Sequence, residues 1–120
     1  MSNYIYGFEK LSVWQSTRSF TKEMYLMTKS FPKDEVFGIT SQMRRATISI
    51  SCNLVEGSAR KSPREQNRFY EIAYGSAVEV LNLLILSNDL EFLSNENYGV
   101  LRNALEKVTY QINRLSRGST

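Results

Sequence analysis

Histidine is absent from this chain, and cysteine occurs once, at Cys52. One cysteine cannot form an internal disulfide, and without histidine the usual zinc and thiol–imidazole sites cannot be assembled. Glu56, Glu71 and Glu79 supply carboxylates, but metal sites in helical bundles normally add histidines from Glu-x-x-His motifs. We therefore expect no metal, no cofactor and no catalytic residue, and we predict that Cys52 is a small, buried helix residue.

Long apolar runs are also missing. No segment approaches the roughly 18 to 20 apolar residues of a membrane-spanning helix, so no membrane association is expected. Residues 1–7 lack the basic start, the apolar stretch and the cleavage site of a signal peptide, which predicts a cytoplasmic protein. A length of 120 residues fits a single domain, 1–120, with one hydrophobic core.

Proline and glycine are sparse, and they mark the turns. Pro32 should end a first helix, because proline disfavours helical geometry in the residue before it. Gly57 is a candidate for the left-handed residue that closes a second helix. Ser62, Pro63 and Glu65 form a capping box that starts a third, and Ser94 precedes a fourth. The predicted helices span about residues 9–31, 35–57, 63–92 and 95–116.

Apolar periodicity supports these helices. In the last one, apolar residues recur in steps of three and four: Tyr98, Leu101, Leu105, Val108, Ile112 and Leu115. The seams expected in the second and third are Ile39, Met43, Ala46, Ile50 and Leu54, then Phe69, Ile72, Ser76, Val80, Leu83 and Leu90. Short connections favour an all-α, antiparallel up-down-up-down four-helix bundle. Residues 77–90 are apolar nearly all round, which predicts a homo-oligomer or, alternatively, a central helix in a compact monomer.

Positive charge is concentrated in one stretch. The 25 positions from Arg44 to Arg68 hold six basic and two acidic residues, a net charge of +4, whereas the whole chain carries +3. The six are Arg44, Arg45, Arg60, Lys61, Arg64 and Arg68. All except Arg45 are expected around the turn between the second and third helices, where they are candidates for nucleic-acid contact. A solvated basic helix end is the alternative.

A polar stripe follows the second helix. Its members, spaced by three or four residues, are Gln42, Arg45, Ser49, Asn53, Glu56 and Arg60. The stripe predicts either a phosphate-binding surface or a structural polar layer. For Asn53 and Glu56 we favour the layer, paired with arginines of the third helix or of a neighbouring subunit. Glu71, Gly75, Ser76 and Glu79 of the third helix are assigned to the same layer or to an interface.

Glycine in the middle of a helix needs a reason, because it costs about 1 kcal/mol relative to alanine. Gly75 and Ser76 therefore predict close approach of the second helix near Ser49 and Asn53, with a ligand pocket as the alternative. Trp14 and the tyrosines at 4, 6, 25, 70, 74, 98 and 110 could stack on bases of single-stranded RNA, but most of them are expected in the core or in an interface. No aromatic ladder alternates with basic residues along the chain.

These residues also resemble a known family. The pattern includes QMRRA at 42–46, Ser49-Ile50, Asn53, Glu56-Gly57, Phe69, Ile72-Ala73, Gly75-Ser76 and Glu79. It resembles the bacterial four-helix-bundle proteins encoded in intervening sequences of 23S rRNA genes. The resemblance implies a left-handed bundle that assembles into a ring, with a pentamer expected. The chain is also similar to the accessory protein of diversity-generating retroelements, a bundle that binds a reverse transcriptase and nucleic acid.

Two functions follow as hypotheses. In the first, a non-enzymatic homo-oligomer presents its basic surface to structured RNA or DNA and multiplies weak contacts. In the second, the oligomer is a scaffold for a protein partner, such as a reverse transcriptase, and does not bind nucleic acid directly. The charge pattern favours the first.

Overall fold

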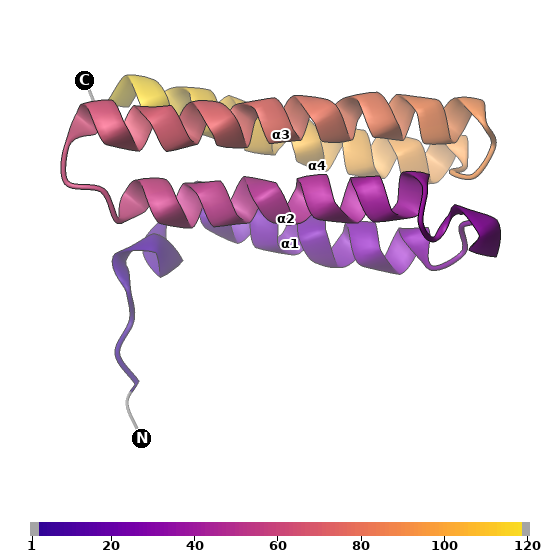
Figure 1. Cartoon of the computed structure of the whole chain (residues 1–120), viewed down its shortest axis with the longest axis horizontal. Helices are drawn as coiled ribbons and strands as arrows, with labels where there is room; N and C mark the ends of the chain where they lie inside the picture. The colour runs from indigo at the N-terminus through magenta and orange to yellow at the C-terminus, as the bar shows by residue number, and fades with distance from the viewer. Residues whose placement is uncertain (1–2, 119–120) are drawn as a thin grey trace.

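The chain folds into four α-helices that lie side by side (Figure 1). A computed structural model describes residues 3–118 and contains no strand within them. The elements are a 3-10 helix η1 (Gly7–Lys10), α1 (Ser12–Thr28), a 3-10 helix η2 (Lys33–Glu35), α2 (Ile39–Ser58), α3 (Pro63–Asp89) and α4 (Asn95–Gly118). Consecutive helices run in opposite directions, so the predicted all-α four-helix bundle is confirmed.

The predicted starts of the third and fourth helices are confirmed by their caps. The Ser62 hydroxyl accepts a hydrogen bond from the Glu65 amide at 3.2 Å, with Pro63 in the first helical position. At α4, the Ser94 hydroxyl accepts from the Asn97 amide at 3.1 Å. In both cases a side-chain oxygen satisfies an amide that has no partner inside the helix.

The first two helices are shorter than predicted. Leu11 has an extended backbone and separates η1 from α1, and α1 ends at Thr28 rather than at Phe31. The next helix was expected from about residue 35, but η2 and a turn come first. Glu35 lies in η2 and accepts from the Ile39 amide at 3.3 Å, so its carboxylate caps the start of α2. Local hydrogen bonds of this kind decide helix ends that periodicity does not resolve.

The core lies between the four helices. The predicted seams of α2 and α4 are confirmed at their central positions, which are buried: Met43, Ala46, Ile50 and Leu54, and Leu101, Leu105, Val108 and Ile112. The predicted seam of α3 was wrong at Ile72 and Leu90, which are 45% and 56% exposed. The buried residues of α3 are Tyr70, Ala73, Ala77, Val80, Leu83, Leu84 and Ser87. Small alanines face the core there, whereas the prediction selected larger apolar residues.

Two glycines have roles opposite to those predicted. Gly57 does not close α2 in a left-handed conformation; it lies buried inside the helix. A Cβ atom at Gly57 would stand 2.6 Å from Cε1 of Tyr70, so glycine is needed for close packing of α3. Gly75 was predicted to permit such packing, but a Cβ atom there would meet nothing within 4 Å. The expected approach of α2 to α3 does occur at Ser76, whose hydroxyl lies 2.8 Å from that of Ser49.

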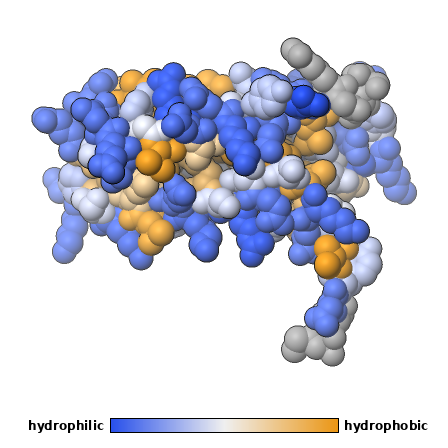
Figure 2. Space-filling view, turned by 180° about the vertical axis from the view of Figure 1, so that it is seen from behind, coloured by the Kyte–Doolittle hydropathy of each residue, from blue (hydrophilic) through white to orange (hydrophobic). Residues whose placement is uncertain are grey.

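Helix α3 keeps much of its apolar surface exposed. Within residues 3–118, α3 is the one helix that is long and apolar enough to cross a membrane, judged by length and composition only. This was not expected from the sequence. A third of its most apolar 18-residue window is buried inside the bundle. A core helix meets the same criterion, and α3 packs against both α2 and α4. Its exposed apolar side chains are Ile72, Tyr74, Val78, Ile85 and Leu86, and Leu90 at its C-cap is exposed as well. By contrast, the side of the bundle seen in Figure 2 is mostly hydrophilic, with small, separate apolar patches.

Candidate nucleic-acid interface

Four of the predicted basic residues meet at the turn between α2 and α3. Lys61, Arg64 and Arg68 are exposed and take part in neither of the two ion pairs found within residues 3–118. Arg60 differs, since it donates to Glu56 at 2.8 Å and its guanidinium lies 4.8 Å from the ring centre of Phe69. Three cations are therefore available for phosphate, and the fourth is held by its neighbours.

The predicted clustering of Arg44 at this turn was wrong. Its guanidinium lies 4.5 Å from the ring centre of Tyr25 and donates to the Thr28 hydroxyl at 3.0 Å. Arg44 and Arg45 lie near the start of α2, and the 16 residues between Arg44 and Arg60 correspond to about 24 Å of helix. Arg44 thus bridges α1 and α2, and the basic stretch of the sequence divides into two separate places.

The fold adds cations that the sequence pattern did not include. The beginning of α1 and the last turns of α4 lie at the same end of the bundle as the α2–α3 turn (Figure 1). Among the side chains described, this basic end carries Lys10, Arg60, Lys61, Arg64, Arg68 and Arg114 against Glu9, Glu56 and Glu65. The opposite end carries Asp34, Glu35, Asp89, Glu91 and Glu96 against Lys29, Lys33, Arg44 and Arg45. The bundle is therefore polarised along its axis.

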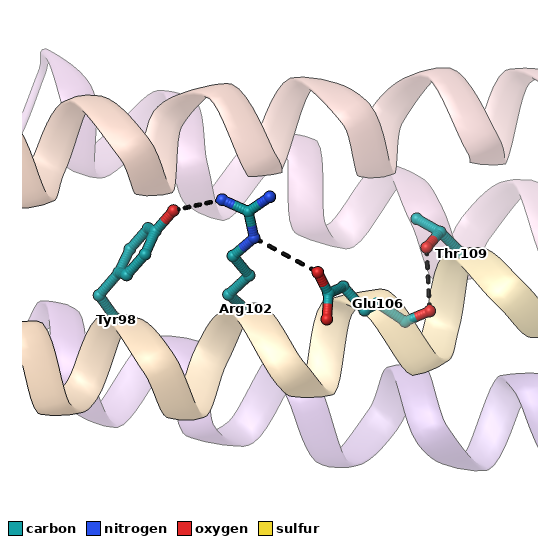
Figure 3. Close-up of polar contacts among 4 residues, drawn as sticks. All are labelled: Tyr98, Arg102, Glu106 and Thr109. Carbon is teal, nitrogen blue, oxygen red and sulfur yellow. Dashed lines mark hydrogen bonds and ion pairs between the residues drawn. The ribbon is translucent and has the colours of Figure 1, made fainter.

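Arg102 of α4 illustrates the difference between a structural and an available arginine. It donates to the Tyr98 hydroxyl at 2.6 Å and to Glu106 at 3.4 Å, while Thr109 donates to the Glu106 carbonyl (Figure 3). The Tyr98 hydrogen bond and then the Glu106 contact raise the pKa of Arg102. All four residues lie on one helix, so this network organises the surface of α4.

The predicted polar layer exists in part. Gln42, Arg45, Ala46, Ser49, Ser76 and Glu79 line a polar cavity of about 390 Å³ between α2 and α3. Neither Asn53 nor Glu56 pairs with an arginine of α3 within residues 3–118: Asn53 donates to the Ser49 carbonyl at 2.9 Å, and Glu56 pairs with Arg60 just after the end of α2. Pairing with a neighbouring subunit stays a prediction. Glu71 and Gly75 are exposed.

Aromatic side chains form a row that the sequence analysis missed. Tyr4 contacts Tyr6 with ring centres 4.9 Å apart, Tyr6 stacks on Phe8 at 6.3 Å, and Phe8 meets Trp14 edge-on at 5.0 Å. The guanidinium of Arg18 lies 5.4 Å from the centre of the Trp14 ring. Aromatic residues at the alternate positions 4, 6 and 8 were the signal for this row in the sequence, but they precede the first predicted helix.

Within residues 3–118, no group of three or more cysteine, aspartate or glutamate side chains is placed to hold a metal ion. Cys52 was predicted to be buried, but it is exposed on α2. It lies three residues after Ser49, one helical turn along α2.

Comparison with known proteins identifies one family and one fold. The model of the family described as 23S rRNA-intervening sequence protein matches residues 9–114. A crystal structure of a protein of unknown function from the S23 ribosomal protein family of Bacteroides thetaiotaomicron has a TM-score of 0.79 and 20% sequence identity. The alignment covers 87% of this chain and 97% of that one, and at this identity it shows a shared fold. No curated protein matches the sequence.

Proposed function

The chain belongs to the 23S rRNA-intervening sequence protein family, and from this premise we propose that it is a non-enzymatic homo-oligomer that binds structured nucleic acid through its basic end. The contact surface comprises Lys61, Arg64 and Arg68, with Arg60 and Arg114 beside them. Arg44 and Arg45 lie outside it. A ring of subunits, with a pentamer as the specific proposal, would present several such surfaces at once and gain affinity by multivalency.

The observation that carries this proposal is the set of exposed cations without carboxylate partners. Lys61, Arg64 and Arg68 are not among the ion-paired residues within residues 3–118. Phosphate contacts by such residues release counterions from nucleic acid, and that release supplies most of non-specific affinity. Arg64 and Arg68 also occupy the first two turns of α3, where the positive end of the helix dipole adds to their charge.

The apolar surface of α3 supports the oligomer. Ile72 and Glu79 of α3 lie one turn either side of Ser76, and Arg45 and Cys52 of α2 lie one turn either side of Ser49. The Ser49–Ser76 contact joins these residues into one α2–α3 face. This face combines apolar side chains with charges of both signs, which suits an interface between copies of the same chain.

Binding to an RNA hairpin and to duplex DNA over a salt series tests the proposal. Wild-type affinity should fall steeply with salt. The triple variant Lys61→Glu, Arg64→Glu, Arg68→Glu should bind more weakly. The slope of log affinity against log salt concentration should become less steep by up to about 3. The matched control is Lys22→Glu, Lys29→Glu, Lys33→Glu, which reverses three exposed charges away from the basic end. Equal losses for both variants would contradict a localised surface, and solution mass shows whether the oligomer persists.

A scaffold for a protein partner, such as a reverse transcriptase, is the second candidate. The exposed apolar residues of α3 favour it, because large apolar surfaces commonly mark protein interfaces. Under this function, an intact oligomer would bind neither nucleic acid even at low salt. That result would remove the first proposal and leave the second.

A further inference from the structure

Two neighbouring cavities open at the basic end. The first, of about 460 Å³, lies between α1, α3 and α4, and the second, of about 480 Å³, lies between η1, α2 and α3. Leu11, Gln66 and Tyr70 line both, so the cavities adjoin where the chain crosses this end of the bundle. Each volume lies within the range of about 300 to 1,000 Å³ typical of small-ligand sites.

The second cavity has aromatic walls. Tyr6 and Phe8 line it from the N-terminal side and Tyr70 from α3. Tyr6 is 61% exposed, although its ring stacks on Phe8. In Figure 1 the segment before η1 stands away from the bundle, and the Tyr4 side chain in this segment is 71% exposed. Exposed aromatic faces beside cations are the usual platform for unpaired bases.

The first cavity is lined in part by polar side chains. Gln66 and Gln111 contribute their amide side chains to its wall. Arg114 lines the same cavity and is exposed, with its guanidinium 3.2 Å from the Tyr110 hydroxyl.

We propose that these adjoining cavities, here called the base site, receive unpaired nucleobases of a single-stranded RNA or DNA segment. One base stacks on Tyr6, and a second enters the first cavity and hydrogen-bonds to the Gln111 side chain that lines it. Their phosphates face Arg114 and the cations of the α2–α3 turn. Duplex bases cannot enter, because their faces are stacked and their edges are paired. The inference rests on the proposed function and narrows it to junctions between paired and unpaired nucleic acid.

A pair of RNA hairpins tests the base site. One is blunt, and the other carries a short single-stranded tail containing 2-aminopurine, whose fluorescence reports stacking. Wild-type protein should bind the tailed hairpin more tightly and change its 2-aminopurine emission. Tyr6→Ala should weaken binding of the tailed hairpin by about 5- to 150-fold, the range expected for loss of one stacked base, and leave the blunt hairpin unchanged. The Tyr6 backbone amide still donates to Glu9 in this variant, so η1 should persist.

Two further variants separate a binding role from a structural one. Phe37→Ala removes an aromatic side chain that is 96% exposed at the opposite end of the bundle. It should leave the affinities for the tailed and the blunt hairpin unchanged. Gln111→Leu removes the amide group of a side chain that lines the first cavity, at similar side-chain volume. It should weaken binding of the tailed hairpin without lowering the melting temperature, whereas a structural Gln111 would lower it.

The outcomes distinguish the two proposals. Failure of wild-type protein to bind either hairpin would overturn the proposed function together with the base site. Equal, salt-dependent binding of both hairpins, unchanged 2-aminopurine emission and no effect of Tyr6→Ala would overturn the base site alone and leave the basic surface intact. Loss of tail preference in both Tyr6→Ala and Gln111→Leu, with unaltered solution mass, is the expected result.

Discussion

Replacing Gly57 by alanine should destabilise the bundle, although the same change stabilises an ordinary helix interior. Alanine is favoured over glycine in a helix by about 1 kcal/mol. At Gly57, however, the new Cβ atom would lie 2.6 Å and 2.9 Å from two ring carbons of Tyr70, and 3.1 Å from Cβ of Phe69. The Tyr70 side chain is 4% exposed and fixed in the core, and the Phe69 atom is one bond from the backbone, so neither can move away freely.

The magnitude follows from these opposing terms. Overpacking a core typically costs about 1–3 kcal/mol, which exceeds the propensity gain and leaves a net loss of about 1 kcal/mol. With an unfolding entropy of about 250 cal/mol/K for a chain of this size, 1 kcal/mol shifts the melting temperature by about 4 °C. Gly57→Ala should therefore lower the melting temperature by roughly 4 °C.

Gly99→Ala is the matched control. Gly99 lies inside α4, and a Cβ atom there would meet nothing within 4 Å, so only the propensity gain remains. It should raise the melting temperature by about 4 °C, and the difference between the two variants isolates the clash. Thermal unfolding followed by circular dichroism measures both. The packing argument would be refuted if Gly57→Ala raised the melting temperature as much as Gly99→Ala does. It would also be refuted if Gly57→Ala lowered the melting temperature by the same amount in a Tyr70→Leu background.

The remaining predictions concern pH and the thiol. Burial raises the pKa of Tyr70 above 10.0, so the folded state retains a proton that an unfolded tyrosine releases near pH 10. The associated stability is complete below about pH 10 and is lost as pH rises through the folded pKa. The free energy of unfolding, measured with denaturant, should fall less above pH 10 in Tyr70→Phe than in the wild type. Identical pH profiles of the two proteins would exclude Tyr70 as the cause. Cys52 is exposed in the single chain and lies on the α2–α3 face; thiol labelling should slow as the oligomer assembles, and unchanged labelling in the assembled form would place the interface elsewhere.

Short-range signals were read correctly because they act within a few residues. Ser62 and Ser94 cap the helices that follow them through hydrogen bonds to residues three positions later. The seam of α4 repeats in steps of three and four, and its central members are buried. The first helix was less predictable, because the break at Leu11 depends on packing of η1 and is not marked by proline or glycine.

The candidate site was only partly predictable. The cations at 60–68 are neighbours in the sequence, and they remain neighbours in the fold. Arg44 was misplaced because the sequence does not state which helix its side chain will meet. Arg114, Gln111 and the aromatic residues before α1 were missed because they are far from residues 60–68 along the chain.

The sequence by itself determined the starts of the third and fourth helices, the amphipathic pattern, the all-α class and the local excess of positive charge, since each depends on spacing within one segment. The tertiary structure alone decided why Gly57 must be glycine, where Arg44 binds, and that Leu11, Tyr70 and Gln111 surround one cavity. Those features depend on the rotation and antiparallel pairing of the helices. Side chains from different helices meet only after that packing is complete, so no local pattern encodes their contact.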